Sequence, residues 1–117
     1  MIKSFRDLQV WEKGMHIVTE TYSITSGNAF HQDFGLRDQM RRSAVSIPSN
    51  IAEGFERKSK AEFRRFIAIA LGSAAELITQ IEISQKIGYL SRIETDGIEK
   101  QLEEVSKMLQ SLKQKTL

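Results

Sequence analysis

The stretch Phe34–Arg57 contains two stripes of side chains, and it limits the possible folds more than any other part of this 117-residue chain. Apolar residues recur every three or four positions, the spacing of one face of an α-helix: Leu36, Met40, Ala44, Ile47, Ile51 and Phe55. A second stripe with this spacing is polar, and most of its side chains are short: Gln39, Ser43, Ser46, Asn50, Glu53 and Arg57. A long helix is therefore predicted over residues 32–57, with a core face and a polar face that makes a specified contact with a neighbour.

Pro48, the only proline of the chain, lies in the middle of this predicted helix. Proline has no N–H and crowds the carbonyl four residues earlier, here that of Ala44, so a bend or a loosened turn is expected. Two interpretations remain open. The helix either tolerates the bend, or Ser46 and the freed Ala44 carbonyl make a specific contact there.

Three further segments show helical spacing. The first covers residues 5–24, with Ser4 as its expected N-cap. The third begins with a capping box, Ser59–Glu62, and ends near Gly88; the fourth begins with another, Ser91–Glu94. Their expected core stripes are Leu8, Trp11, Met15, Val18 and Tyr22 in the first, Phe63, Ile67, Ala70, Ala74, Leu77 and Ile81 in the third, and Ile98, Leu102, Val105, Leu109 and Leu112 in the fourth.

Four amphipathic helices of similar length, joined by short connections such as a loop expected at residues 25–31, predict one particular architecture. They pack most readily as an antiparallel up-down-up-down four-helix bundle. The fold class is thus all-α, with a single domain over residues 1–117. The third helix also carries Phe66 and Ile69 beside its core stripe, so we expect a second buried contact there, between subunits.

Composition excludes several classes of function. The chain has no cysteine, which rules out disulfides, thiolate metal sites and cysteine catalysis. The N-terminus lacks the apolar core of a signal peptide. The longest apolar run, residues 66–78, is interrupted and shorter than the ~20 residues of a membrane span. A cytoplasmic protein is expected.

Positive charge is concentrated between residues 37 and 65, although the net charge of the chain is only +2. Arginine pairs bidentately with phosphate, and such contacts supply most sequence-independent affinity for nucleic acid. The candidate nucleic-acid-binding residues are Arg37, Arg41, Arg42, Arg57, Lys58, Lys60, Arg64 and Arg65. We expect them at one end of two successive helices. The alternative is a solvated, salt-bridged surface, since Asp38, Glu56 and Glu62 are interleaved.

The polar stripe predicts an interhelical or subunit-contact network that fixes helix register. Its candidate members are Gln39, Ser43, Ser46, Asn50, Glu53, Ser73 and Glu76. Paired carboxylates could instead act as general acid and base. The sequence supplies no nucleophile, oxyanion hole or cofactor loop to accompany them, so we expect neither an enzyme nor a cofactor. Gly54 and Gly72 match no phosphate-binding loop and more readily mark close helix approach.

A di-iron centre is the metal site that helical bundles commonly hold. It requires Glu-x-x-His motifs on two helices. The chain has only His16 and His31, and neither follows a glutamate by three residues. No metal site is expected.

Several motifs together resemble the four-helix-bundle family of proteins encoded in 23S rRNA intervening sequences. They lie at residues 5–11 (FRDLQVW), 34–44 (FGLRDQMRRSA), 46–54 (SIPSNIAEG), 63–73 (FRRFIAIALGS), 76–77 and 88–89. The resemblance implies a left-handed antiparallel bundle that assembles as a homopentameric ring. It also implies a likeness to the accessory proteins of diversity-generating retroelements, which work with a reverse transcriptase and RNA. It implies no catalytic residue.

Three functional hypotheses follow. The leading one is a non-enzymatic oligomer that binds nucleic acid, structured RNA or rRNA, through its arginine-rich surface. The second is a scaffold whose polar stripe binds a protein such as a reverse transcriptase, without a nucleic-acid role of its own. The third is a purely structural ring.

Overall fold

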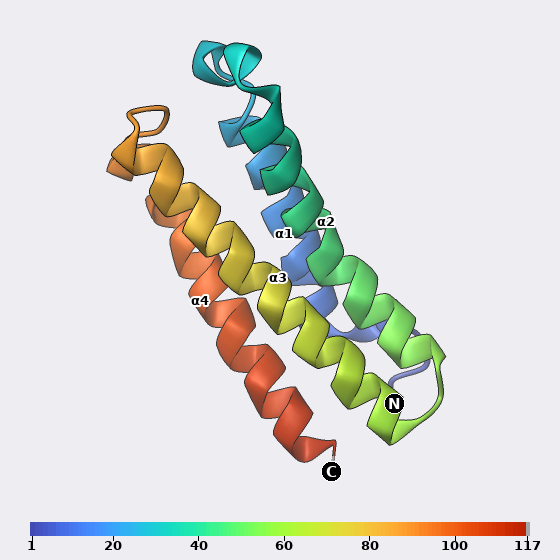
Figure 1. Ribbon diagram of the computed structural model, residues 1–117. Coiled ribbons are helices and arrows are strands. Elements are labelled where there is room, and N and C mark those ends of the chain that lie inside the picture. The colour runs from blue at the N-terminus through green and yellow to red at the C-terminus, as the bar shows by residue number, and fades with distance from the viewer. Residues whose placement is uncertain (117) are drawn as a thin grey trace.

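Four α-helices make up the bundle in the computed structural model, which describes residues 1–116. They are α1 (Gln9–Ile24), α2 (Phe34–Glu56), α3 (Lys60–Lys86) and α4 (Arg92–Lys115), with short 3-10 helices η1 (Phe5–Asp7) and η2 (Asn28–Gln32). Each helix packs against its neighbours in sequence, and α1 also packs against α4. The predicted up-down-up-down bundle is confirmed, and no strand occurs within residues 1–116. It measures 43 × 21 × 20 Å, with both termini at one end (Figure 1).

The first predicted helix is divided in two. The side chains of Ser4 and Asp7 form a capping box around η1, and Leu8 is extended, so α1 begins only at Gln9. The expected loop at residues 25–31 contains most of η2.

The caps of the last two helices follow the sequence more closely. The hydroxyl of Ser59 accepts from the N–H of Glu62, but the Glu62 carboxylate bonds Arg65 instead of closing the box. The capping box of Ser91 and Glu94 is complete. Gly88 ends the turn after α3 with a positive φ of 82°, which glycine adopts at little cost.

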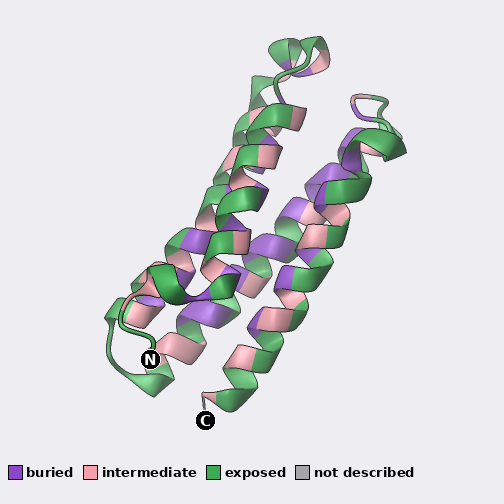
Figure 2. Ribbon diagram, turned by 180° about the vertical axis from the view of Figure 1, so that it is seen from behind, coloured by how far each residue is buried: buried purple, intermediate pink, exposed green. Residues whose placement is uncertain are grey.

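The core confirms the predicted stripes of α2, α3 and α4, whose central members are buried (Figure 2). The stripe predicted for α1 is wrong at Met15 and Tyr22, whereas Leu8, Trp11 and Val18 belong to the core or pack against it. Val10, Gly14, Ile17 and Thr21 are the buried residues of α1, whereas Met15 and Tyr22 are 41% and 43% exposed. Helix α1 packs against α2 through Gly14, where an added Cβ would lie 3.4 Å from the Cβ of Pro48, in ordinary van der Waals contact. The face of α1 that meets α2 is thus centred on Gly14 rather than on Met15.

Glycine also brings α2 and α3 together. A Cβ at Gly54 would lie 2.6 Å from the Cβ of Phe66, so the two helices touch there. Phe66, predicted to face another subunit, is therefore buried within the chain, whereas Ile69 is 40% exposed. Helix α2 continues through Pro48 without interruption.

Helix α3 is long and apolar enough to cross a membrane by length and composition alone. The apolar run predicted to be too short therefore belongs to a helix that meets this criterion. However, 44% of its most apolar window is buried inside the bundle. Because it packs against both α2 and α4, its buried apolar residues belong to the core of the bundle.

Candidate nucleic-acid interface

The antiparallel topology brings three separate stretches of chain to one end of the bundle. They are residues 1–10, residues 53–65 and residues 107–116 (Figure 1). An ion pair of 2.6 Å between Lys13 and Glu104 shows that α1 and α4 lie alongside each other just above this level. We call these three stretches the basic end.

The basic end has a large excess of positive charge. It contains ten basic residues and four acidic ones, a net charge of +6. The basic residues are Lys3, Arg6, Arg57, Lys58, Lys60, Arg64, Arg65, Lys107, Lys113 and Lys115, and the acidic ones are Asp7, Glu53, Glu56 and Glu62. The rest of the chain has seven basic and eleven acidic residues, a net charge of −4. Charge is thus polarised along the 43 Å length of the bundle.

The structure separates the eight predicted binding residues into two groups. Arg57, Lys58, Lys60, Arg64 and Arg65 lie at the basic end. Arg37, Arg41 and Arg42 lie near the start of α2 instead. Because α2 continues through Pro48, positions 37 and 57 are about 30 Å apart at 1.5 Å per residue. The expectation that all eight occupy one end of the two helices is wrong.

Half of the basic end was missed by sequence reasoning. Lys3 and Arg6 precede α1, and Lys107, Lys113 and Lys115 lie in the last turns of α4. A count along the sequence separates these residues from Arg57–Arg65. The signal that could have found them is the topology itself, since an up-down-up-down bundle places the start of its first helix and the end of its fourth beside the turn between the second and third.

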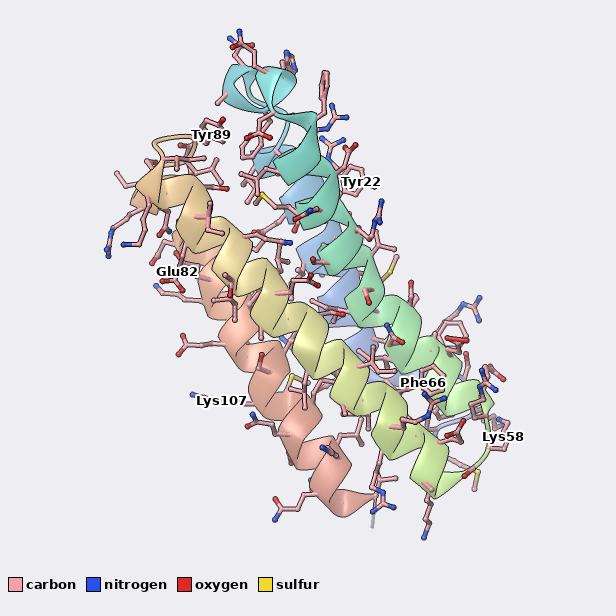
Figure 3. All side chains as sticks on the ribbon, in the orientation of Figure 1. Tyr22, Lys58, Phe66, Glu82, Tyr89 and Lys107 are labelled. Carbon is pink, nitrogen blue, oxygen red and sulfur yellow. The ribbon has the colours of Figure 1, made fainter. Side chains whose placement is uncertain are left out.

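Two arginines of the basic end are held by aromatic and carboxylate groups. The guanidinium carbons of Arg57 and Arg65 lie 5.1 and 4.6 Å from the centre of the Phe66 ring. Figure 3 labels Phe66 on α3 and Lys58 in the turn before that helix. Arg65 also makes two hydrogen bonds to Glu62, of 2.9 and 3.2 Å. These bonds lower the pKa of the Glu62 carboxyl and raise the pKa of Arg65. Arg57 lies 3.5 Å from a carboxylate oxygen of Glu53.

The other eight cations of the basic end make no ion pair within residues 1–116. Lys58 occupies the turn between α2 and α3 with a positive φ of 58°, and its Nζ lies 5.0 Å from the centre of the Phe55 ring. Lys60 is exposed, and the buried Nε of Arg64 has no hydrogen-bond partner. Most of the charge at this end is therefore available to an external anion.

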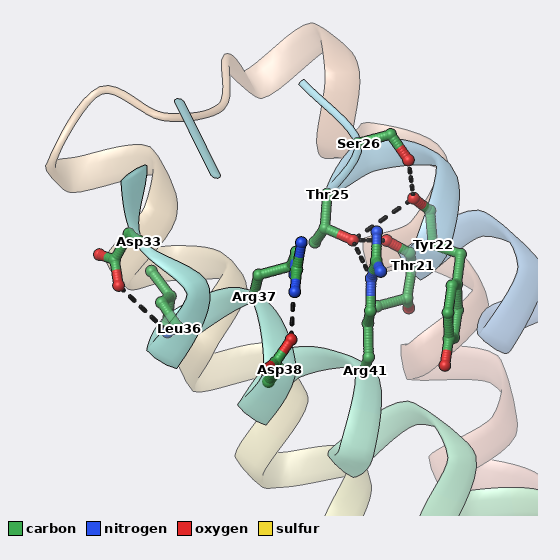
Figure 4. A network of polar contacts seen from close by, with 9 residues as sticks. All are labelled: Thr21, Tyr22, Thr25, Ser26, Asp33, Leu36, Arg37, Asp38 and Arg41. Atoms are coloured by element: carbon green, nitrogen blue, oxygen red, sulfur yellow. Dashed lines mark hydrogen bonds and ion pairs between the residues drawn. The ribbon is translucent and has the colours of Figure 1, made fainter. Parts of the chain in front are cut away.

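The arginines near the start of α2 are largely engaged within the chain (Figure 4). The Nε of Arg37 donates to Asp38 at 3.0 Å, and its guanidinium lies over the ring of Phe34. The Nε of Arg41 donates to Thr25 Oγ1 at 2.9 Å, and its guanidinium lies 4.4 Å from the ring centre of Tyr22. Of these three arginines, only Arg42 is exposed and makes no ion pair within residues 1–116.

The structure brings only part of the predicted polar network together. Ser73 donates to the hydroxyl of Ser46 at 2.8 Å across the α2–α3 seam, and Asn50 donates to the same hydroxyl at 2.8 Å and to the Ser46 carbonyl at 2.7 Å. Ser43 is buried near the seam. The specific contact expected near Pro48 is thus made by Ser46. No side chain of residues 1–116 donates to the Ala44 carbonyl.

The remaining members of that prediction face solvent. Gln39, Glu53 and Glu76 are all exposed, and Glu53 pairs only with Arg57 of its own helix. The two carboxylates are thus neither buried nor paired with each other. His16 and His31 are also exposed, and residues 1–116 contain no cluster of three or more histidine, aspartate or glutamate side chains suited to a metal ion.

Comparison with known proteins agrees with the fold. Residues 6–111 match the family model of 23S rRNA-intervening sequence proteins. The chain is also similar to the crystal structure of a protein of unknown function from the S23 ribosomal protein family of Bacteroides thetaiotaomicron VPI-5482, with 26% identity and a TM-score of 0.80 over 88% of this chain and 96% of that one. None of the curated proteins matches the chain. Because the family match covers nearly the whole sequence, this chain belongs to the family of 23S rRNA-intervening sequence proteins.

Proposed function

We propose that this protein is a non-enzymatic homo-oligomer that binds structured RNA through its basic end. The observation that carries the proposal is the polarised charge, with +6 at the basic end and −4 over the rest of the chain. Phosphate groups are the natural partners of such a surface, because each lysine or arginine that reaches a phosphate releases a condensed counterion.

The local chemistry of the basic end supports recognition of the RNA backbone rather than of bases. The Phe66 ring is only 5% exposed and lies beneath Arg57 and Arg65, so it is not a free platform for base stacking. The rings of Phe5 and Phe55 are likewise half-buried and lie against Arg6 and Lys58. Lysines and arginines that reach phosphates read shape and phosphate spacing, which is how folded RNA is usually bound.

The family name provides weaker support. It refers to intervening sequences of 23S rRNA, and the similar solved structure is described as a member of a ribosomal protein family. Both names concern RNA, and neither describes an enzyme. The homo-oligomer is proposed as the ring of five implied by the resemblance of the sequence motifs. Exposed apolar residues on α1, α2 and α3 support association.

The test is a titration of a labelled RNA hairpin, followed by fluorescence anisotropy at several salt concentrations. Wild-type protein is expected to bind with log Kd rising steeply with log salt. A triple variant of exposed basic-end lysines, Lys58→Glu, Lys60→Glu and Lys113→Glu, should lose most of this affinity.

A matched control makes the same change of charge outside the basic end. Lys86, Arg92 and Lys100 are exposed, and the one ion pair among them is an exposed one between Lys100 and Asp96, so their replacement by glutamate makes the same change of charge. This control should bind RNA far better than the lysine triple variant. Equal losses would contradict the assignment to the basic end. If the wild type does not bind RNA at low salt, the RNA-binding proposal is rejected. The remaining hypothesis is then a scaffold that binds a protein such as a reverse transcriptase.

A further inference from the structure

Gly72, in the middle of α3, has no explanation within the chain. A glycine inside a helix is about 1 kcal/mol less favourable than alanine. At Gly54 the reason is clear, because an added Cβ would lie 2.6 Å from the Cβ of Phe66 on the neighbouring helix. At Gly72 an added Cβ would meet nothing within 4 Å. Gly72 is exposed, so no packing contact within the chain accounts for glycine at this position.

The surface around Gly72 has other unmatched features. Ile69 and Ile83 share its face of the helix and are 40% and 42% exposed. Glu76 follows Gly72 by one turn, is exposed, and makes no ion pair within residues 1–116. We call these four residues the α3 face.

A buried polar group without a partner continues the same row. Gln80 follows Glu76 by four residues and is only 6% exposed, yet its Oε1 has no hydrogen-bond partner. An unsatisfied buried acceptor is costly, and native structures rarely leave one. Rotation of the Gln80 side-chain amide about its last carbon–carbon bond would turn Oε1 towards the α3 face. A hydrogen-bond donor on a second molecule at that face would then satisfy this oxygen.

A second face of the chain complements the α3 face in charge and shape. Met15, Tyr22 and Val45 are each 40–43% exposed, and they lie on α1 and α2 beside Arg41 and Arg42. Tyr22, Arg41, Arg42 and Val45 line a hollow of about 510 Å³ between α1 and α2, together with Ser46 and with Asp38, which pairs with Arg37. We call Met15, Tyr22, Arg41, Arg42 and Val45 the α1–α2 face. Its unpaired Arg42 complements Glu76 in charge, and its hollow complements protruding isoleucines.

The two faces lie at the same height along the bundle. Gly14, next to Met15, packs against Ile47 and Pro48, so Met15 is level with the middle of α2. The hydrogen bond between Ser46 and Ser73 places Val45 level with Gly72. Copies related by a rotation about an axis parallel to the bundle could therefore bring one face against the other without sliding.

We infer that the α3 face, centred on Gly72, docks against the α1–α2 face of a second copy of this chain. The contact joins two different surfaces, so it is heterologous and can close into a ring. The inference rests on the proposed homo-oligomer and adds to it the surfaces through which the copies meet.

The test compares two glycines by sedimentation velocity over a range of concentrations. Gly97 in α4 is the matched control, because it is exposed and an added Cβ there would also meet nothing within 4 Å. Gly72→Leu should weaken association at least tenfold while raising the thermal stability of the monomer. Gly97→Leu should raise stability without weakening association.

A charge exchange provides a second, independent readout. Glu76→Arg and Arg42→Glu should each weaken association, and the double variant should recover part of the loss. If wild-type protein associates but both glycine variants associate equally well and the exchange shows no recovery, the inferred surfaces are wrong while the proposed oligomer stands. A wild-type chain that stays monomeric would overturn the oligomer and the docking contact together. Neither result bears on RNA binding by the basic end.

Discussion

The two ends of this bundle each contain an edge-to-face aromatic pair, that of Phe30 and Tyr89 at 5.3 Å and that of Phe55 and Phe63, but they differ in how polar groups join their helices. At the end opposite the basic end, polar groups bond one another. Asp33 caps α2 at the Leu36 N–H, and its other carboxylate oxygen accepts from the Tyr89 hydroxyl at 3.0 Å. Gln85 joins Thr95 and Glu99 across the α3–α4 seam, at 2.6 and 2.9 Å.

At the basic end, apolar contacts join the helices. Gly54 lets α2 touch α3 at Phe66, and the rings of Phe55 and Phe63 meet edge to face at 6.1 Å. Because packing rather than ion pairing closes this end, most of its lysines and arginines face solvent. The comparison shows how one bundle can be stable at both ends and still present a large excess of positive charge at only one.

The largest expected effect tests the apolar packing at the basic end. Gly54→Ala places a Cβ 2.6 Å from the Cβ of Phe66, and neither atom can rotate away because each is attached directly to a backbone. We expect a loss of at least about 2 kcal/mol in the free energy of unfolding, measured with urea. Gly97→Ala, whose Cβ would meet nothing, should instead gain up to about 1 kcal/mol. A Gly54→Ala variant as stable as wild type would show that packing does not hold this end.

A smaller loss of stability is expected at the end opposite the basic end. Asp33→Ala removes the cap of α2 and the acceptor of Tyr89 together, which should cost about 1–2 kcal/mol. Asp38→Ala is the control, since Asp38 is exposed and pairs only with its neighbour Arg37. Equal stabilities for the two variants would show that the hydrogen bonds of Asp33 do not stabilise this end.

The smallest effect is a dependence on alkaline pH. The hydrogen bond to Asp33 raises the pKa of Tyr89. A raised pKa in the folded state means that this bond stabilises fully below the ordinary tyrosine pKa of about 10 and loses its effect as pH rises through the folded value. The difference in melting temperature between wild type and Tyr89→Phe should therefore narrow above that pH. A constant difference between wild type and Tyr89→Phe would contradict the assigned bond.

Much of the fold could be predicted from the spacing of apolar residues. In α2, α3 and α4 one stripe is clearly stronger than any other, and those faces are buried. In α1 two stripes compete. The choice between them depends on Gly14 meeting Pro48, a contact between helices that no local pattern contains.

The candidate site was only half predictable, for a related physical reason. A count of charge along the sequence places Arg37 and Arg57 in one cluster, because both belong to the same predicted helix. A helix of 23 residues separates its two ends by roughly 30 Å, however, and the fold instead joins Arg57 to Lys113. Position along the bundle axis, rather than position along the sequence, decides which charges act together.

The most direct test of the central claim is lysine acetylation followed by mass spectrometry, with and without a bound RNA hairpin. One experiment measures the reactivity of lysines at the basic end and of lysines outside it. We predict that RNA protects Lys58, Lys60 and Lys113 several-fold and leaves Lys86 and Lys100 unchanged. Equal protection of all these lysines, or protection centred on Lys86, would contradict the claim that the basic end holds the RNA.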